Sequence, residues 1–214
     1  MSGKISAGKV VWTSFFVDVL DVLINFWIMI VTGSVVMVAE LFQGVSDLVA
    51  SGLLLVGLKR PKKEIYFWSF MSAIVMLFIA STLSFYFGLK RFLHPEEIKN
   101  IFLAYAILIV NITSNGYAFY LSIKRILKGK NWRMVIKEFK DSKLLITKNT
   151  FVLDLMGMGA GVVGLAALVL YQLFGEIRFD GLGAMGIGLV LAILSIDLIL
   201  NIRRLRKTGE RIDL

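Results

Sequence analysis

The chain has 214 residues, of which 57% are hydrophobic, and its formal net charge is +9. With a mean hydropathy of +0.79, it carries more apolar surface than a water-soluble domain of this size can bury. It holds no cysteine, which excludes disulfides and thiolate metal ligands. A basic excess in a membrane protein reflects topology and contact with anionic headgroups, so no nucleic acid partner is expected. The lipid bilayer is therefore the predicted solvent.

Six apolar runs are each long enough to cross a bilayer as an α-helix, which needs about 20 residues. We place these spans at residues 9–32, 35–58, 65–89, 99–123, 150–174 and 179–202. The first run is too long for the core of a signal peptide, so we expect it to remain in the mature protein. The predicted fold is thus all-α and polytopic, with one transmembrane domain over residues 1–202. Residues 203–214 are expected to form a short basic cytoplasmic tail, with no cytoplasmic domain.

Basic residues are distributed asymmetrically between the predicted connections. If both termini lie in the cytoplasm, the Lys and Arg residues outside are Lys90, Arg91, Lys99 and Arg178. The positive-inside rule therefore favours cytoplasmic termini, and we expect the plasma (inner) membrane. The longest connection, residues 124–149, mixes apolar residues with lysines. It fits either an amphipathic segment on the inner leaflet or a solvated linker.

Acidic residues interrupt the apolar runs, although an ionisable group inside a bilayer costs about 2.5 to 3.5 kcal/mol on insertion scales. The spans contain no matching set of Lys or Arg, so internal salt bridges do not account for these acids. Unpaired carboxylates in lipid must be protonated, hydrated or bound to a cation. The acids are Asp18, Asp21, Glu40, Asp47, Asp154 and Asp197, accompanied by Asn25, Gln43, Asn111, Asn115 and Asn201.

Helical spacing sorts these polar residues onto shared faces. Gln43 and Asp47 are four residues apart, and Glu40 lies one turn earlier on the same face. The fifth predicted helix presents Asp154 and, four residues later, Met158. Further stripes are Asp18, Asp21 and Asn25 on the first helix, and Asn111 and Asn115 on the fourth. Converging faces of this kind predict an oxygen-rich chamber, which suits hard or borderline divalent cations, whereas a Met thioether suits softer ions.

Several of these residues also fit structural roles. Asn111 and Asn115 suit hydrogen bonds between helices, and the glycines of the last two spans suit close helix packing. Asp18 fits a place near the inner headgroups, and Asp197 fits pairing with the arginines of the tail. Asp47 lies close to the centre of its span, where a functional role is the favoured interpretation.

The stretch from Asn25 to Lys59, NFWIMIVTGSVVMVAELFQGVSDLVASGLLLVGLK, resembles the first two helices of the cation diffusion facilitator family, in its zinc transporter nine-like branch. The resemblance is colinear with six spans and covers nearly the whole chain. It continues in Tyr66-Phe67-Trp68, Phe85-Tyr86-Phe87-Gly88-Leu89, Leu93-His94-Pro95-Glu96, Asn115-Gly116-Tyr117, residues 138–143 and Phe179-Asp180-Gly181.

Family members are similar in a tetrahedral metal site with one [His/Asp]-x-x-x-Asp pair on the second helix and another on the fifth. They exchange zinc, manganese, iron or related divalent ions such as cobalt for protons, usually as homodimers. The resemblance therefore implies a divalent metal cation transporter, an efflux antiporter working by alternating access, and not an enzyme. It places the metal ligands at Gln43, Asp47, Asp154 and Met158, with Glu40, Asp21, Asn25, Asp18 and Asn115 as pathway residues or proton carriers.

The ligand positions depart from the family pattern. Gln43 offers one neutral carbonyl and Met158 a soft sulfur, so a tetrahedral zinc site of His and Asp is not reproduced. We expect lower affinity or altered selectivity, with proton coupling resting on Asp47 and Asp154. The alternative is a non-transporting structural or regulatory relative with a degenerate site. Without the family's cytoplasmic domain, a homodimer would form through the membrane helices.

The two predicted carboxylate ligands differ in their expected depth in the membrane. Hydropathy places Asp47 near the middle of its span but Asp154 near the inner end of the fifth span. If both carboxylates bind one ion, the fifth helix must begin earlier, around Leu144, or sit shifted outward. Otherwise the two carboxylates belong to different layers.

Overall fold

The computed structural model describes residues 6–61, 64–142 and 144–207, and within these residues it contains helices and turns but no strand. Six helical segments are long and apolar enough to cross a membrane, which confirms the prediction of an all-α, six-span protein. Their elements are α1 (Ala7–Thr32), α2 (Val35–Leu58), α3 (Ile65–Val75) running through the π-helix η1 (Met76–Ser81) into α4 (Thr82–Leu93), α5 (Ile101–Leu127), α7 (Leu145–Phe174) and α8 (Arg178–Lys207).

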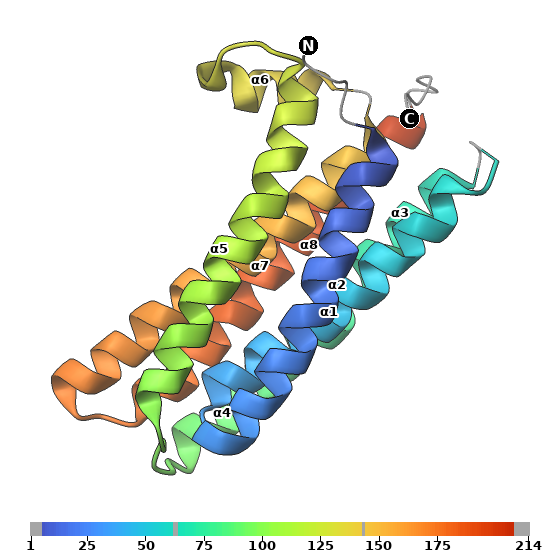
Figure 1. Cartoon of the computed structure of the whole chain (residues 1–214). Coiled ribbons are helices and arrows are strands. Elements are labelled where there is room, and N and C mark those ends of the chain that lie inside the picture. The colour runs from blue at the N-terminus through green and yellow to red at the C-terminus, as the bar shows by residue number, and fades with distance from the viewer. Residues whose placement is uncertain (1–5, 62–63, 143, 208–214) are drawn as a thin grey trace.

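The long helices lie side by side in one bundle (Figure 1). The start of α1 and the end of α8 lie at the same end of this bundle, which we call the terminal end. The opposite end holds the tight connection between α1 and α2, and we call it the turn end. There Gly33 adopts a left-handed φ of 63°, and its amide donates to the carbonyl of Met29. Of the expected tail at residues 203–214, the part up to Lys207 belongs to α8, and the rest lies outside the described residues.

The connection between α5 and α7 contains a 3₁₀ turn (Trp132–Met134) and the short helix α6 (Val135–Asp141), which lies at the terminal end of the bundle beside the end of α5 (Figure 1). Phe139 packs its ring 4.6 Å from that of Phe151 on α7, whereas Ile136 is 72% exposed. One face of this segment therefore packs on the bundle, whereas the exposed residues mix apolar Trp132 and Ile136 with basic Arg133 and Lys137. This arrangement fits the amphipathic interpretation better than a solvated linker.

Helix α7 begins at Leu145, five residues before the start that hydropathy predicts. The first turn and a half of α7 is polar because it contains Thr147, Asn149 and Thr150. Hydropathy therefore assigns these residues to the connection before the helix. All three side chains are nevertheless buried, and the Asn149 amide donates to the carbonyl of Ser69 on α3 at 3.1 Å. Helix packing therefore satisfies groups that hydropathy assigns to water.

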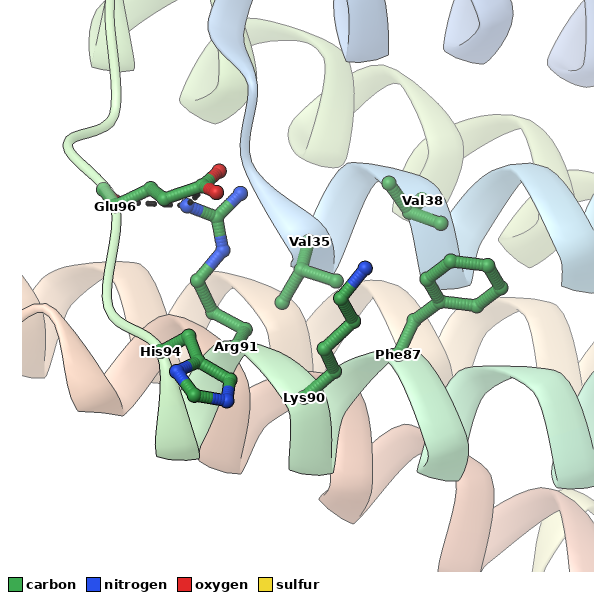
Figure 2. A pocket seen from close by; sticks show the side chains of 7 residues that line it. All are labelled: Val35, Val38, Phe87, Lys90, Arg91, His94 and Glu96. Carbon is green, nitrogen blue, oxygen red and sulfur yellow. Dashed lines mark hydrogen bonds and ion pairs between the residues drawn. The ribbon is translucent and has the colours of Figure 1, made fainter.

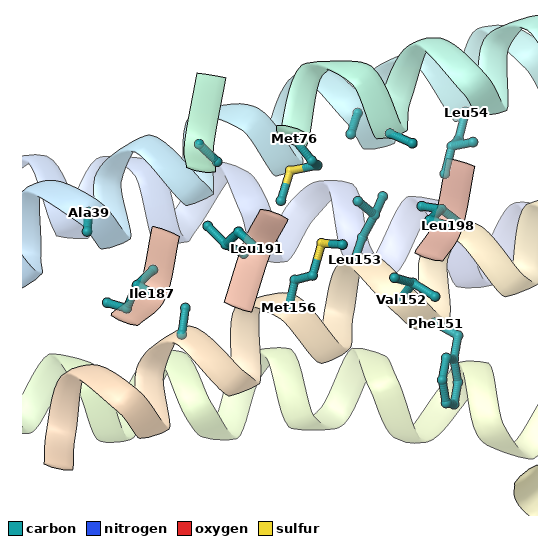
Figure 3. Packing of buried hydrophobic residues seen from close by; sticks show 14 of the residues in the cluster. Ala39, Leu54, Met76, Phe151, Val152, Leu153, Met156, Ile187, Leu191 and Leu198 are labelled. Carbon is teal, nitrogen blue, oxygen red and sulfur yellow. The ribbon is translucent and has the colours of Figure 1, made fainter. Parts of the chain in front are cut away.

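Apolar side chains fill the space among α2, η1, α7 and α8 (Figure 3). Met76, Met156 and Leu191 are fully buried there. Many other large apolar residues point outward, such as Phe16 and Trp27 on α1, which are 61% and 65% exposed. An outward apolar surface of this kind suits helices that lipid surrounds.

Glycines bring the backbones of α4 and α8 into direct contact. A Cβ on Gly88 would lie 2.6 Å from the backbone nitrogen of Met185, and one on Gly181 would lie 2.7 Å from that of Phe92. Neither distance leaves room for a side chain. These positions have the small residues that close packing of membrane helices requires.

Candidate metal centre

Polar side chains from four helices meet inside the bundle, and we call this set the polar column. They lie three or four residues apart along α1 and α2, and four and seven residues apart along α5, so each helix turns one polar face inward. From Ser14 to Asn25 the column extends about 16 Å at about 1.5 Å per residue, roughly half of the hydrocarbon core. Its members, each at most 6% exposed, are Ser14, Asp18, Asp21, Asn25, Glu40, Gln43, Asp47, Ser51, Asn111, Asn115, Ser122 and Asp154.

The layer nearest the terminal end is built around Asp154 of α7. Ser14 of α1 donates to its Oδ1 at 2.5 Å, and Ser122 of α5 donates to its Oδ2 at 3.1 Å. Both carboxylate oxygens therefore have hydroxyl partners, and three helices meet at this one group. These two serines are not among the residues that the sequence predicts for the site. Ser14 lies four residues before Asp18 on one helical face, a spacing that would have revealed it.

The next layer holds Asp18 and Asp47. Ser51 of α2 donates to Asp18 Oδ2 at 2.6 Å, and Gln43 donates its amide to Asp47 Oδ2. The second oxygen of Asp47, Oδ1, is buried without a hydrogen-bond partner. The Asp47 carboxylate interacts electrostatically with those of Asp18, Asp154 and Asp21. Four acidic groups from three helices thus lie in adjoining layers of the column.

Asp47 and Asp154 lie at similar depths. Asp47 is eleven residues from the end of α2, and Asp154 is nine residues from the start of α7. At about 1.5 Å per residue these separations are about 16 Å from the end of α2 and about 14 Å from the start of α7. The early start of α7 therefore places Asp154 one layer from Asp47, a short distance that hydropathy alone did not predict.

Asp21 and Asn115 form the following layer. Asn115 donates to Asp21 Oδ2 at 2.6 Å, and Ser114 donates to Oδ1 at 3.3 Å. A Cβ on Gly157 of α7 would lie 2.5 Å from Asn115 Oδ1 and 3.0 Å from Gln43 Nε2. Because this glycine has no side chain, the two amides pack against the backbone of α7.

The layer nearest the turn end consists of Asn25, Glu40 and Asn111. The Asn111 amide donates to Asn25 Oδ1 and to Glu40 Oε2, both at 3.0 Å. Asn111 therefore joins α1 to α2, as its interpretation as a helix-to-helix hydrogen-bonding residue predicts.

Two residues that the sequence analysis considers, Met158 and Asp197, do not face the polar column. Met158 is half-buried, and its sulfur lies 3.9 Å from the place of a Cβ on Gly116, so the thioether packs against α5. Asp197 is on an exposed face of α8, where it accepts a hydrogen bond from Asn201 at 2.9 Å. Within residues 6–61, 64–142 and 144–207, no three His, Cys, Asp or Glu side chains are grouped as a metal site. A cation in the column would therefore need amide or hydroxyl oxygens beside the carboxylates.

At the turn end, a cavity of about 150 Å³ has a different chemistry (Figure 2). Lys90, Arg91 and His94 line it together with Glu96, whose carboxylate pairs with Arg91 at 3.2 Å. Arg91 also lies 3.7 Å from the buried Asp180. The positive charges of Lys90 and Arg91 disfavour a metal cation here, so we take the polar column as the candidate centre.

Asp180 stabilises the start of α2 from the neighbouring α8. Its carboxylate accepts from the Ser34 hydroxyl at 2.6 Å and from the amides of Val35 and Val36 at 2.8 and 3.0 Å. The first amides of a helix have no partner within the helix, and a carboxylate at this end also complements the helix dipole. In the sequence Asp180 stands out only as part of the segment Phe179-Asp180-Gly181, which resembles the family.

The bundle and its column define a polytopic helical membrane protein with a carboxylate-lined interior. Residues 11–204 match the family model of the cation efflux transmembrane domain, so the chain belongs to the cation efflux, or cation diffusion facilitator, family.

Among curated relatives, the chain is similar to the mitochondrial proton-coupled zinc antiporter SLC30A9 of several vertebrates. It is 26% identical to the Mus musculus and Homo sapiens proteins over 210 residues, which are 90% of this chain and 36% of each relative. For the Xenopus laevis protein the identity is 26% over 212 residues, or 90% and 37%. The chain therefore spans little more than a third of the length of the curated relatives it matches.

Proposed function

We propose that this chain carries a divalent metal cation across a membrane by alternating access, in exchange for protons. The observation that supports this proposal most directly is the group of Asp18, Asp47 and Asp154 in the polar column. Among the described residues, none of these carboxylates forms an ion pair with Lys or Arg. A buried carboxylate without such a partner needs a proton, water or a cation. A metal–proton exchanger binds a proton and a metal cation alternately at such a group.

In this proposal Asp47 is the central ligand, because its Oδ1 already lacks a hydrogen-bond partner. Asp154 supplies the second carboxylate from α7, after its serine partners release one oxygen. Gln43 contributes its amide oxygen, and Met158 reaches the ion by a rotamer change. The same two carboxylates take up protons when the metal leaves.

The cargo in this proposal is zinc, manganese, iron or cobalt. The relatives named above are zinc antiporters, which favours zinc. The column, however, presents carboxylate, amide and hydroxyl oxygens and no imidazole or thiolate, a donor set that harder ions such as manganese prefer. Competition between these metals in a flux assay identifies the cargo.

Flux into proteoliposomes tests the proposal. Asp47→Asn and Asp154→Asn should each lower metal flux at least tenfold, because each removes one of two ligand charges with little change in shape. Asp197→Asn is the matched control, since Asp197 is an exposed carboxylate outside the column, and its flux should equal that of the unchanged chain. Equal flux in all three variants would contradict the assignment.

The orientation proposed is that the terminal end faces the cytoplasm of a plasma or inner membrane. The basic residues of this end support it through the positive-inside rule. Because the sequence holds no cysteine, single variants such as Glu97→Cys and Lys128→Cys give a clean test. An impermeant thiol reagent should label Glu97→Cys in intact cells and Lys128→Cys only after lysis. We also propose a homodimer formed through the membrane helices, which native mass spectrometry tests.

One observation favours a second candidate, a non-transporting relative with a structural or regulatory role. Gln43 donates to Asp47, and both oxygens of Asp154 accept from serines, so the predicted ligands already bond to the protein. A chain of this kind would bind divalent metal weakly or not at all and would show no flux. Calorimetry on the purified chain, together with the flux assay, separates the two candidates.

A further inference from the structure

The layer nearest the turn end contains polar residues that do not belong to the metal site proposed at Asp47 and Asp154, which we call the central site. Asn25, Glu40 and Asn111 come from three different helices, and each is at most 1% exposed. The Asn111 amide donates to one oxygen of each of the other two side chains at 3.0 Å. We call these three residues the outer triad.

The outer triad is incompletely satisfied by the protein. Glu40 Oε1 and Asn111 Oδ1 are buried acceptors without a hydrogen-bond partner, and Asn25 Nδ2 is a donor without one. An unpaired buried polar atom costs about 1 to 3 kcal/mol, and an uncompensated carboxylate costs more. Among the described residues, Glu40 forms no ion pair with Lys or Arg. A bound cation would satisfy both unpaired oxygens at once.

The outer triad is too far from the central site to share its ion. Glu40 precedes Asp47 by seven residues on α2, about 10 Å along the helix. Ligand oxygens lie only about 2.0 to 2.6 Å from a divalent ion. The layer of Asp21 and Asn115 lies between the two positions and makes the polar path continuous.

We propose that the outer triad is a second binding site for a divalent metal cation, on the side of the polar column toward the turn end. Its ligands are Glu40 Oε1, Asn111 Oδ1 and Asn25 Oδ1, the last of which becomes available when the Asn111 amide rotates so that its Nδ2 no longer donates to Asn25. One carboxylate and two amide carbonyls form an all-oxygen set, which selects hard ions over soft ones. That the ion passes through this site during transport rests on the function proposed above, whereas binding itself does not.

Binding of Mn²⁺ to the purified full chain in detergent tests this inference, because the electron paramagnetic resonance signal of free Mn²⁺ counts bound ions. The unchanged chain should bind two Mn²⁺. Glu40→Gln should bind one, and the double variant Asp47→Asn with Asp154→Asn should also bind one. Adding Glu40→Gln to that double variant should abolish binding. Glu97→Gln is the matched control, because Glu97 is exposed in the connection between α4 and α5, and it should bind two.

A gain-of-function variant guards against misfolding as the cause of lost binding. Asn111→Asp adds a second carboxylate to the outer triad and should lower the Kd of one Mn²⁺ site at least threefold. The inference is wrong if Glu40→Gln binds as many Mn²⁺ as the unchanged chain, or if Asn111→Asp leaves every Kd unchanged. A single bound ion that Glu40→Gln removes would retain the outer triad and refute the site of Asp47 and Asp154. Two bound ions without any metal flux would instead retain the outer triad and refute the transport function.

Discussion

Gly157 offers a test of whether packing inside the polar column controls activity. The substitution Gly157→Ala removes no charge and no ligand, but its Cβ would lie 2.5 Å from Asn115 Oδ1 and 2.7 Å from Asn115 Cγ. Contacts below 3.0 Å require movement, and Asn115 is held by its 2.6 Å hydrogen bond to Asp21. The methyl group must therefore displace Asn115 and weaken this bond.

The expected cost follows from that displacement. Overpacking of a filled interior costs about 1 to 3 kcal/mol, and a weakened hydrogen bond adds about 1 kcal/mol. The better helix propensity of alanine offsets at most about 1 kcal/mol. Gly159→Ala is a matched control on the same helix, because its Cβ would meet Val190 at an ordinary 3.9 Å.

Thermal unfolding in detergent, followed by size-exclusion chromatography, measures the difference between the two variants. For a chain of this length 1 kcal/mol corresponds to about 2 to 4 °C in Tm. Gly157→Ala should therefore have a Tm about 2 to 12 °C below that of Gly159→Ala, and a lower metal flux at temperatures where both are folded. Equal Tm and equal flux in the two variants would refute the tight packing of Asn115 against α7.

Two further predictions concern the turn end and the contact between α4 and α8. Asp180→Asn leaves Arg91 without its buried partner and weakens the cap of α2. We therefore expect the free energy of unfolding to fall by about 3 to 5 kcal/mol, measured as a lower Tm. The control is Glu176→Gln at an exposed position, which should change Tm little. Gly88→Ala forces the backbones of two helices apart and should lower Tm by several degrees, whereas Gly8→Ala, with no atom within 4 Å of its Cβ, should not. If Asp180→Asn or Gly88→Ala had the same Tm as its control, the corresponding contact would be contradicted.

The amino-acid sequence by itself determined the six membrane helices and the inward faces of α1 and α2. Apolar run length decides whether a segment crosses a bilayer, and helical spacing decides which residues share a face, so both are local properties. Asp18, Asp21 and Asn25 were grouped correctly for this reason. Family resemblance then distinguishes Asp47 and Asp154 from the other acids as the predicted ligands.

The tertiary structure alone decided which layer each acid occupies and what it contacts. Asp154 came within one layer of Asp47 because α7 begins at Leu145, where contacts with α3 satisfy a polar turn that hydropathy assigns to water. The serine partners of Asp154 and the contacts of Asp180 lie far away in the sequence, 140 residues in the case of Ser14. Hydropathy sums the preferences of neighbouring residues, so it carries no information about hydrogen bonds that form between distant helices.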